Sequence, residues 1–200
     1  MSQLILYACP VGELATQIEQ YFQESLKRYG KNSAHAYMPH CTLTGFFDKG
    51  KDRNIVEHYT QLLLQVFTEH RALLPANSIT VEPLAFHEAW HGLPLQANAL
   101  KQLIAIFAEQ AKASKYPVAL RLKDWLHLSL AYDFDPGQAK GLQALAAEMI
   151  DVAASVDWEI RFYEREKTGI DTKGIAIASQ PPTKQHSPPD NWICHCSFPL

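Results

Sequence analysis

The sequence predicts a fold of mixed helices and strands built as two related halves. Short β-prone runs alternate with amphipathic helical segments along most of the chain. Two of the strands carry the same short motif, His-x-Thr/Ser-Leu, beginning at His40 and at His127, 87 residues apart. In each half the order is a helix, the motif strand, a second helix and another strand. A repeat of this period predicts two related lobes that face each other.

The first half contains three strand patterns and two helical patterns. Apolar residues recur three and four positions apart in the helical segments, and β-branched and aromatic residues fill the strand segments. Pro10 is expected to end the first strand, and Gly30 to cap the first helix. In order, we expect a strand at 3–9, a helix at 14–29, a strand at 40–47, a helix at about 53–69, and a strand at 78–86 interrupted at Pro83.

The second half repeats this order and ends in a proline-rich segment. The expected elements are a strand at 90–95, helices at 97–114 and 138–152, and strands at 126–132, 156–163 and 175–178. Residues 180–191 hold four prolines and little apolar content, so we expect them to be extended.

The totals indicate one soluble domain spanning residues 1–200. The chain is 47% hydrophobic and 20% charged, with a net charge of −3. Tight binding to duplex nucleic acid is therefore not expected, although a local site for a small anion remains open. No apolar run is long enough to span a membrane, and no leader is recognisable, so we expect a cytoplasmic protein with reduced cysteines.

Both motifs place a histidine and a hydroxyl on one strand face. Side chains at i and i+2 point the same way, so His40 projects with Thr42 and His127 with Ser129. One neutral imidazole can take a proton from water, while the other, protonated, can give one to a leaving oxygen. The hydroxyls can bind the non-bridging phosphoryl oxygens. This set suits phosphodiester hydrolysis without a metal or another cofactor.

A single match to this motif is weak, because the chain has nine histidines. A third match begins at His195, but it lies near the end of the sequence, after the proline-rich segment, and no helix follows it. The two remaining histidines also have a structural interpretation, as half-buried strand residues that hydrogen-bond their own neighbours. Spacing alone leaves both interpretations open.

Paired motifs of this form resemble those of the two-histidine (2H) phosphoesterase superfamily. The flanks MPHCTLTGFF and WLHLSLAYDF, with WEIRFYERE further on, are similar to the phosphoesterase domain of the TULA proteins, which also carry ubiquitin-associated and SH3 domains. The resemblance implies an α+β, bilobal fold in which each lobe has a small antiparallel sheet flanked by helices, with the active-site cleft between the lobes. It implies His40 and His127 as the catalytic pair and Thr42 and Ser129 as phosphate-binding residues. On this interpretation the chain is a stand-alone version of the catalytic module.

Aromatic residues near the motifs are candidates for stacking on a nucleobase, although core or rim packing is an alternative role for each. They are Tyr132, Trp90, Phe46, Tyr37 and Trp125. We expect no metal site. Gly92 and Pro94 argue against a helix that would bring His87 and His91 together, and the Cys194-His195-Cys196 spacing suits one tetrahedral site poorly.

The leading hypothesis is therefore an enzyme that hydrolyses a 2′,3′-cyclic phosphate of a nucleotide or RNA end, or a related 2′-linked phosphodiester. The expected partner is this small nucleotide or RNA-end substrate, not a membrane. The main alternative is a module that binds a nucleotide or RNA end without turnover. A histidine-rich metal hydrolase is a third hypothesis. The sequence leaves open the base preference, the isomer of the product, the roles of the two histidines and the oligomeric state.

Overall fold

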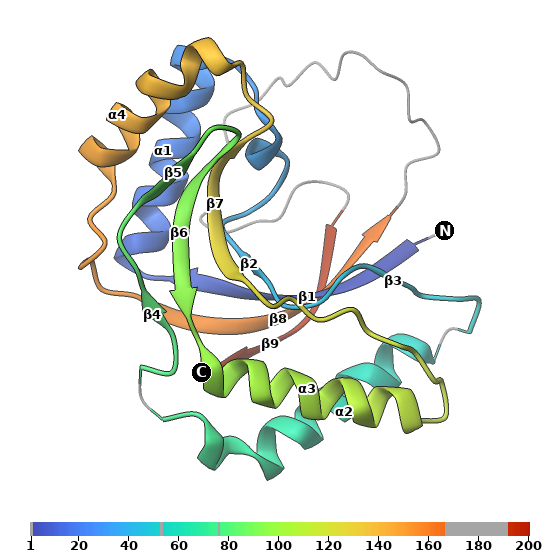
Figure 1. Ribbon diagram of the computed structural model, residues 1–200. Helices are drawn as coiled ribbons and strands as arrows, with labels where there is room; N and C mark the ends of the chain where they lie inside the picture. Colours follow the sequence, from blue (N-terminus) through green and yellow to red (C-terminus); the bar gives the residue numbers. More distant parts are fainter. Residues whose placement is uncertain (1, 53, 76, 167–191) are drawn as a thin grey trace.

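The computed structural model describes residues 2–52, 54–75, 77–166 and 192–200. Within these ranges, four α-helices and nine strands form an α+β fold, which confirms the predicted class (Figure 1). The proline-rich segment at 180–191 and the strand predicted at 175–178 lie outside the described residues. No described helix has the length and apolar character needed to cross a membrane.

All described strands belong to one antiparallel sheet, in the order β4-β6-β7-β2-β1-β8-β9, with β3 paired to β1 and β5 to β6. The strands are β1 (Ser2–Val11), β2 (Cys41–Thr42), β3 (Phe47–Asp48), β4 (Thr80–Val81), β5 (Ala85–His87), β6 (Trp90–Gln96), β7 (Leu126–Tyr132), β8 (Asp157–Glu166) and β9 (Trp192–Pro199).

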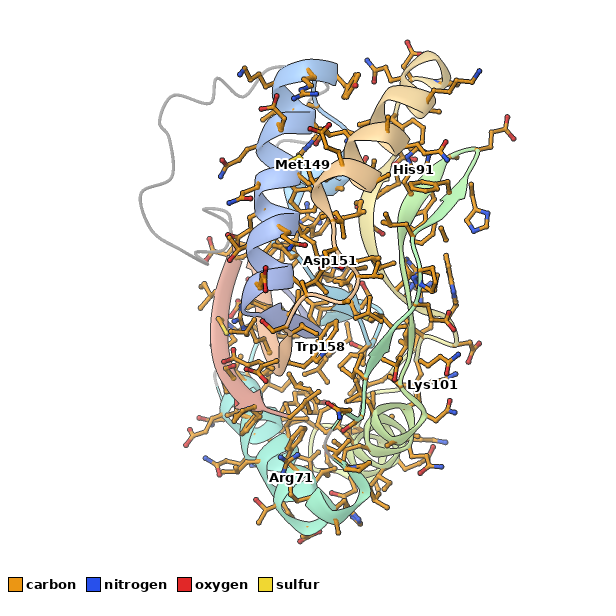
Figure 2. All side chains as sticks on the ribbon, turned by 90° about the vertical axis from the view of Figure 1, so that its left-hand side faces the viewer. Arg71, His91, Lys101, Met149, Asp151 and Trp158 are labelled. Carbon is orange, nitrogen blue, oxygen red and sulfur yellow. The ribbon has the colours of Figure 1, made fainter. Side chains whose placement is uncertain are left out.

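The helices pack in two pairs, α1 with α4 and α2 with α3, at opposite ends of the sheet (Figure 1). Their bounds are α1 (Glu13–Tyr29), α2 (Ile55–Glu69), α3 (Asn98–Ala113) and α4 (Ala139–Met149), with short 3-10 helices η1 (Ser33–Ala36), η2 (Arg71–Leu73) and η3 (Pro136–Gln138). The perpendicular view shows the two pairs at the two ends of the body, with the buried Trp158 between them (Figure 2).

The order and pairing of the elements repeat between the two halves of the chain. β1-α1-β2-α2-β4 is followed by β6-α3-β7-α4-β8, and the final strand of each unit pairs with the first strand of the other. The lobes do not carry separate small sheets as predicted, because β2 pairs directly with β7 and joins the halves into one sheet. Pseudo-symmetry of the lobes stays a prediction.

Several strands differ from the prediction, and β8 ends at Glu166, three residues later than predicted. β1 continues through Pro10 to Val11. Proline has no N–H to donate, but β2 pairs with β1 only as far as Ala8, so no hydrogen bond to β2 is lost at Pro10. The strand expected at 40–47 is divided into β2 and β3, because the Thr44 hydroxyl accepts from the Leu6 N–H at 3.2 Å in place of a carbonyl. β9 was not predicted.

The sheet has two different faces. The main core contains Leu4, Leu6 and Ala8 of β1 together with apolar side chains from all four helices. The alternate β1 residues, Ile5 and Tyr7 among them, belong to a smaller cluster with aromatic residues on the other face. Because Tyr7 lies opposite Thr42, this second face is the one to which the motif hydroxyl points.

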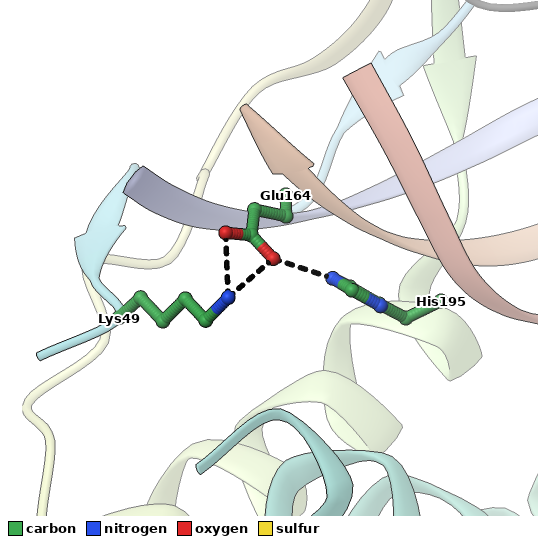
Figure 3. Close-up of polar contacts among 3 residues, drawn as sticks. All are labelled: Lys49, Glu164 and His195. Atoms are coloured by element: carbon green, nitrogen blue, oxygen red, sulfur yellow. Dashed lines mark hydrogen bonds and ion pairs between the residues drawn. The ribbon is translucent and has the colours of Figure 1, made fainter. Parts of the chain in front are cut away.

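The third motif match lies in a different environment from the first two. Its histidine, His195 on β9, contacts the buried carboxylate of Glu164 through Nε2 at 2.9 Å (Figure 3). Lys49 Nζ donates to both oxygens of the same carboxylate, at 2.7 and 2.8 Å. The three residues join β8 and β9 to the segment after β3, so His195 has a structural role.

Replacing Glu164 with glutamine is expected to lower the free energy of unfolding by about 1–3 kcal/mol, because the Lys49 ammonium loses its buried partner. Burial raises the pKa of Glu164, but hydrogen bonds from Lys49, Ser2 and His195 outweigh it and hold the pKa below its ordinary value. This contribution is therefore present above about pH 4.5 and is lost as the pH falls through the lower folded pKa. Urea unfolding of both proteins between pH 3 and 7 measures the difference.

The matched control is Glu24→Gln, which removes an exposed pair with Arg28 on α1. We expect little change at any pH for that variant, because solvent screens the pair. A stability difference for Glu164→Gln that does not shrink in acid would contradict the assigned ion pair.

Candidate functional site

The second motif lies on β7, and the first lies at the neighbouring β2, with His40 immediately before its first residue. Cys41 of β2 pairs with Leu128 of β7 in antiparallel register. The same register places His40 beside Ser129 and Thr42 beside His127. Each histidine therefore stands opposite the hydroxyl of the other motif, and the two imidazoles are diagonal neighbours on one face. Diagonal neighbours of this kind are roughly 7 Å apart at Cβ, a spacing into which a phosphate fits.

His40 is held by its own backbone and by Tyr7. Its Nδ1 lies 2.8 Å from the Met38 carbonyl oxygen, which can only accept, so Nδ1 carries the proton and Nε2 is the acceptor nitrogen of the neutral ring. The Tyr7 ring packs against the imidazole with centroids 4.1 Å apart. Burial lowers the pKa of His40 to about 4; the Met38 hydrogen bond opposes this, and the charge of His127 adds to it. His40 is therefore neutral at pH 7, as a general base must be.

His127 is enclosed by two indoles. Trp125 lies over its ring with centroids 4.0 Å apart, and Trp90 meets it edge-on at 5.0 Å. Its Nδ1 is buried without a partner at hydrogen-bond geometry among the described residues, although a looser contact with the Trp125 backbone raises its pKa. Burial outweighs this contact, and Lys123 lowers the pKa further, so the pKa of His127 lies below its usual value.

Ser129 is oriented by Trp90. The indole Nε1 donates to Ser129 Oγ at 2.9 Å, and because the hydroxyl accepts there, its own proton is free for a phosphoryl oxygen. Trp90 reaches Ser129 by lying across Gly92, where an added Cβ would overlap both the indole and the Leu128 carbonyl. Trp90, proposed from the sequence as a stacking residue, is thus placed to position Ser129.

Tyr132 reaches the site face through an irregularity in β7. Strict alternation from Ser129 would turn Tyr132 toward the core. The register between β6 and β7 shifts between His91 and Gly92, so that Gly92 pairs with Ser129 but Trp90 pairs with Tyr132. The extra residue in β7 returns the tyrosine to the side of Ser129.

A cavity of about 200 Å³ opens beside the first motif. It is lined by His40 and Thr42 and by three of the predicted stacking residues, Tyr37, Phe46 and Tyr132. A wider hollow of about 500 Å³ shares Tyr37 and Tyr132 with it. The structure thus brings these three aromatics together with His40, whereas Trp125, 50% exposed, lies on the His127 side.

Sequence reasoning missed two basic residues that line the same cavity, Arg121 and Lys123. They stand six and four residues before His127, in the segment RLKDW. That proximity to a motif was the one signal that the sequence offered. Tyr7 was also missed, since it reads as an ordinary core residue of a strand.

The described residues contain no group of three or more histidine, cysteine, aspartate or glutamate side chains that could hold a metal ion. Cys9 and Cys41 are buried free thiols. Arg165 lies over the rings of Tyr37, Phe46 and Trp192, with its guanidinium carbon 5.5–5.9 Å from their centroids, and so fixes the aromatic wall of the site.

No family model matches the chain. Several curated proteins are similar to it in sequence. The chain is 32% identical over 170 residues to human ubiquitin-associated and SH3 domain-containing protein B, covering 82% of this chain and 25% of the relative. It is 30% identical over 168 residues to the ecdysteroid-phosphate phosphatase of Bombyx mori, covering 82% of this chain and 24% of that relative. The Drosophila melanogaster ecdysteroid-phosphate phosphatase is 28% identical over 199 residues, covering 82% of this chain and 26% of that relative.

The chain spans about a quarter of the length of these curated relatives. The aligned part covers 82% of the present chain in each case. These relatives confirm the resemblance predicted from the flanks of the two motifs. The chain is therefore related, over about four fifths of its length, to the TULA proteins, whose phosphoesterase domains belong to the two-histidine superfamily.

Proposed function

We propose that the chain is a metal-independent phosphodiesterase that hydrolyses a 2′,3′-cyclic phosphate, on a nucleotide or an RNA end, or a related 2′-linked phosphodiester. The observation that supports this most is the pairing of Cys41 with Leu128, which brings two imidazoles and two hydroxyls to one face. A site that only bound a nucleotide would need no such pair of proton donor and acceptor.

The reaction uses one imidazole on each side of phosphorus. A neutral histidine takes a proton from water, whose oxygen attacks phosphorus. As the bond to the ribose oxygen breaks, the other histidine, protonated, gives its proton to that oxygen. The product is a phosphomonoester and a ribose hydroxyl. Thr42 and Ser129 hold the non-bridging oxygens throughout, and Trp90 keeps the Ser129 hydroxyl directed at them.

The names of the relatives suggest a second class of substrate. Two of them are named as phosphatases of ecdysteroid phosphates, which are phosphomonoesters. The chain corresponds to a quarter of each, so that activity can reside in the rest of those proteins. A phosphomonoester therefore belongs in any test of the reaction.

The deciding experiment is a substrate panel with wild-type protein, with and without EDTA. It contains 2′,3′-cyclic mononucleotides, RNA ending in a cyclic phosphate, a 2′-5′ dinucleotide and a steroid phosphate. We expect turnover of one or more of the diesters, insensitive to EDTA, and none of the steroid phosphate. Tight binding of a cyclic nucleotide without product over hours would instead identify a binding module, and turnover of the monoester alone would overturn the proposal.

The pH dependence of kcat/KM is expected to be bell-shaped, with its maximum below pH 6.5. Activity requires one neutral and one protonated imidazole, and both pKa values lie below the ordinary value because both rings are buried. Acid protonates the base, with a limb near pH 4, and a rising pH removes the proton of the acid. Because a cyclic phosphate stays monoanionic over this range, the profile reports on the protein. A maximum above pH 8 would contradict the assignment.

A further inference from the structure

The cavity beside the first motif, whose lining does not include His127 or Ser129, holds more positive charge than the proposed reaction requires. Arg121 and Lys123 both line it, together with His40 and Thr42. In the part of the chain that the structure describes, neither cation forms an ion pair with a carboxylate. This surplus occurs in a chain whose net charge is −3, so it is a local feature of the site.

The position of these cations is set by backbone pairing with the motif segment. The Lys123 N–H donates to the Leu43 carbonyl at 3.2 Å, the Gly45 N–H donates to the Arg121 carbonyl at 2.6 Å, and Thr44 forms a bridge with Leu122. The segment that carries both cations is therefore fixed against the residues that follow Thr42. The two basic residues keep a constant place relative to the catalytic groups.

Gly45 makes room for the Arg121 guanidinium. A Cβ added at Gly45 would lie 2.8 Å from Arg121 Nε and 3.1 Å from Nη2. The side chain of Arg121 thus packs across the glycine, at the margin of the cavity. An arginine held in this way presents its donors in a fixed plane, which suits a phosphate.

The charge of the scissile phosphate is balanced without Arg121 and Lys123. A phosphodiester carries one negative charge, which one protonated imidazole balances, and the two hydroxyls hold its free oxygens. Lys123 lies close enough to His127 to lower the pKa of that histidine, so its charge acts on the motif residues. An anion bound at Arg121 and Lys123 would neutralise this excess.

We propose that Arg121 and Lys123 form a second anion-binding site, so that the preferred substrate carries a phosphate group beyond the scissile one. This inference rests on the proposed function for the position of the scissile phosphate. The second phosphate has two sources with the same chemistry: a 5′-phosphate on the same nucleoside, or the next phosphodiester of an oligonucleotide.

Binding of product mimics tests the site without requiring turnover. Titrations of adenosine 2′-monophosphate, adenosine 2′,5′-bisphosphate and a diadenosine with a terminal 2′-phosphate can be followed by calorimetry. We expect the wild-type protein to bind one or both of the doubly phosphorylated ligands about tenfold more tightly than the monophosphate, or better. The doubly phosphorylated ligand that binds more tightly than the monophosphate identifies the source of the second phosphate.

Arg121→Ala is expected to reduce this preference about tenfold or more, and Arg121→Lys to restore part of it. The matched control is Arg71→Ala, which removes an exposed arginine of η2 (labelled in Figure 2) that does not line the cavity. Equal affinities of the wild-type protein for all three ligands would overturn the inference, as would a preference that Arg121→Ala leaves intact. Failure of turnover in the substrate panel, with this preference present, would overturn only the proposed function.

Discussion

Replacing either His40 or His127 with alanine is expected to lower kcat by about 10²- to 10⁴-fold, because each supplies one of two proton transfers. The double variant should be little worse than the poorer single variant, since the two imidazoles act as a unit. Initial rates on the best diester of the substrate panel measure the loss. Circular dichroism and urea unfolding establish that each variant is folded.

The third motif match supplies the control for this experiment. His195→Ala removes a histidine with the same local pattern, but one that contacts Glu164 on β8. It should retain most of the turnover and lose only some stability. A single variant at His40 or His127 that keeps most of the wild-type kcat would overturn the assignment of the pair.

Gly92→Ala is expected to lower the free energy of unfolding by about 3 kcal/mol, at the upper end of the cost of overpacking. An added methyl group would overlap the Leu128 carbonyl, which is backbone and cannot turn away, as well as the Trp90 indole. We also expect a lower kcat, because displacement of Trp90 releases Ser129. Urea unfolding gives the first quantity, and rates at low temperature, where the variant is folded, give the second.

Gly137→Ala in η3 is the matched substitution. A Cβ there would meet only the Asp135 carboxylate, at 3.3 Å, and that side chain can move. We expect a change of less than about 1 kcal/mol. If Gly92→Ala proved equally mild, the close approach of β6 to β7 at this position would be wrong.

Much of the secondary structure could be predicted because it depends on local pattern. The alternation of Leu126, Leu128 and Leu130 with His127 and Ser129 predicted β7 with its observed bounds. The same pattern did not predict β2 as a two-residue strand. There, Thr44 replaces a backbone acceptor with its hydroxyl, and nothing in the local sequence distinguishes a threonine that does this from one that continues a strand.

The shared face of the two residues in each motif could be predicted because i and i+2 spacing fixes it whatever the tertiary context, while their catalytic role stays a proposal. The remaining residues of the site depend on contacts between distant segments. Tyr7 lines the cavity because β1 pairs with β2, and Arg121 lines it because its carbonyl accepts from Gly45. The hydrogen bond from Trp90 to Ser129 could not be predicted for a similar reason, since it requires Gly92 to lie beneath the indole.

The pairing of β2 with β7 has a consequence for how the proposed site forms during folding. Each motif supplies one imidazole and one hydroxyl, and the two histidines are 87 residues apart in the chain. The proposed site therefore forms only when this contact of long sequence separation is made. Helix formation requires no such closure and is fast, whereas long-range strand pairing is slow. During refolding, recovery of turnover should therefore lag behind recovery of the helical circular dichroism signal. The rate at which turnover recovers would then report when the two halves of the chain pair.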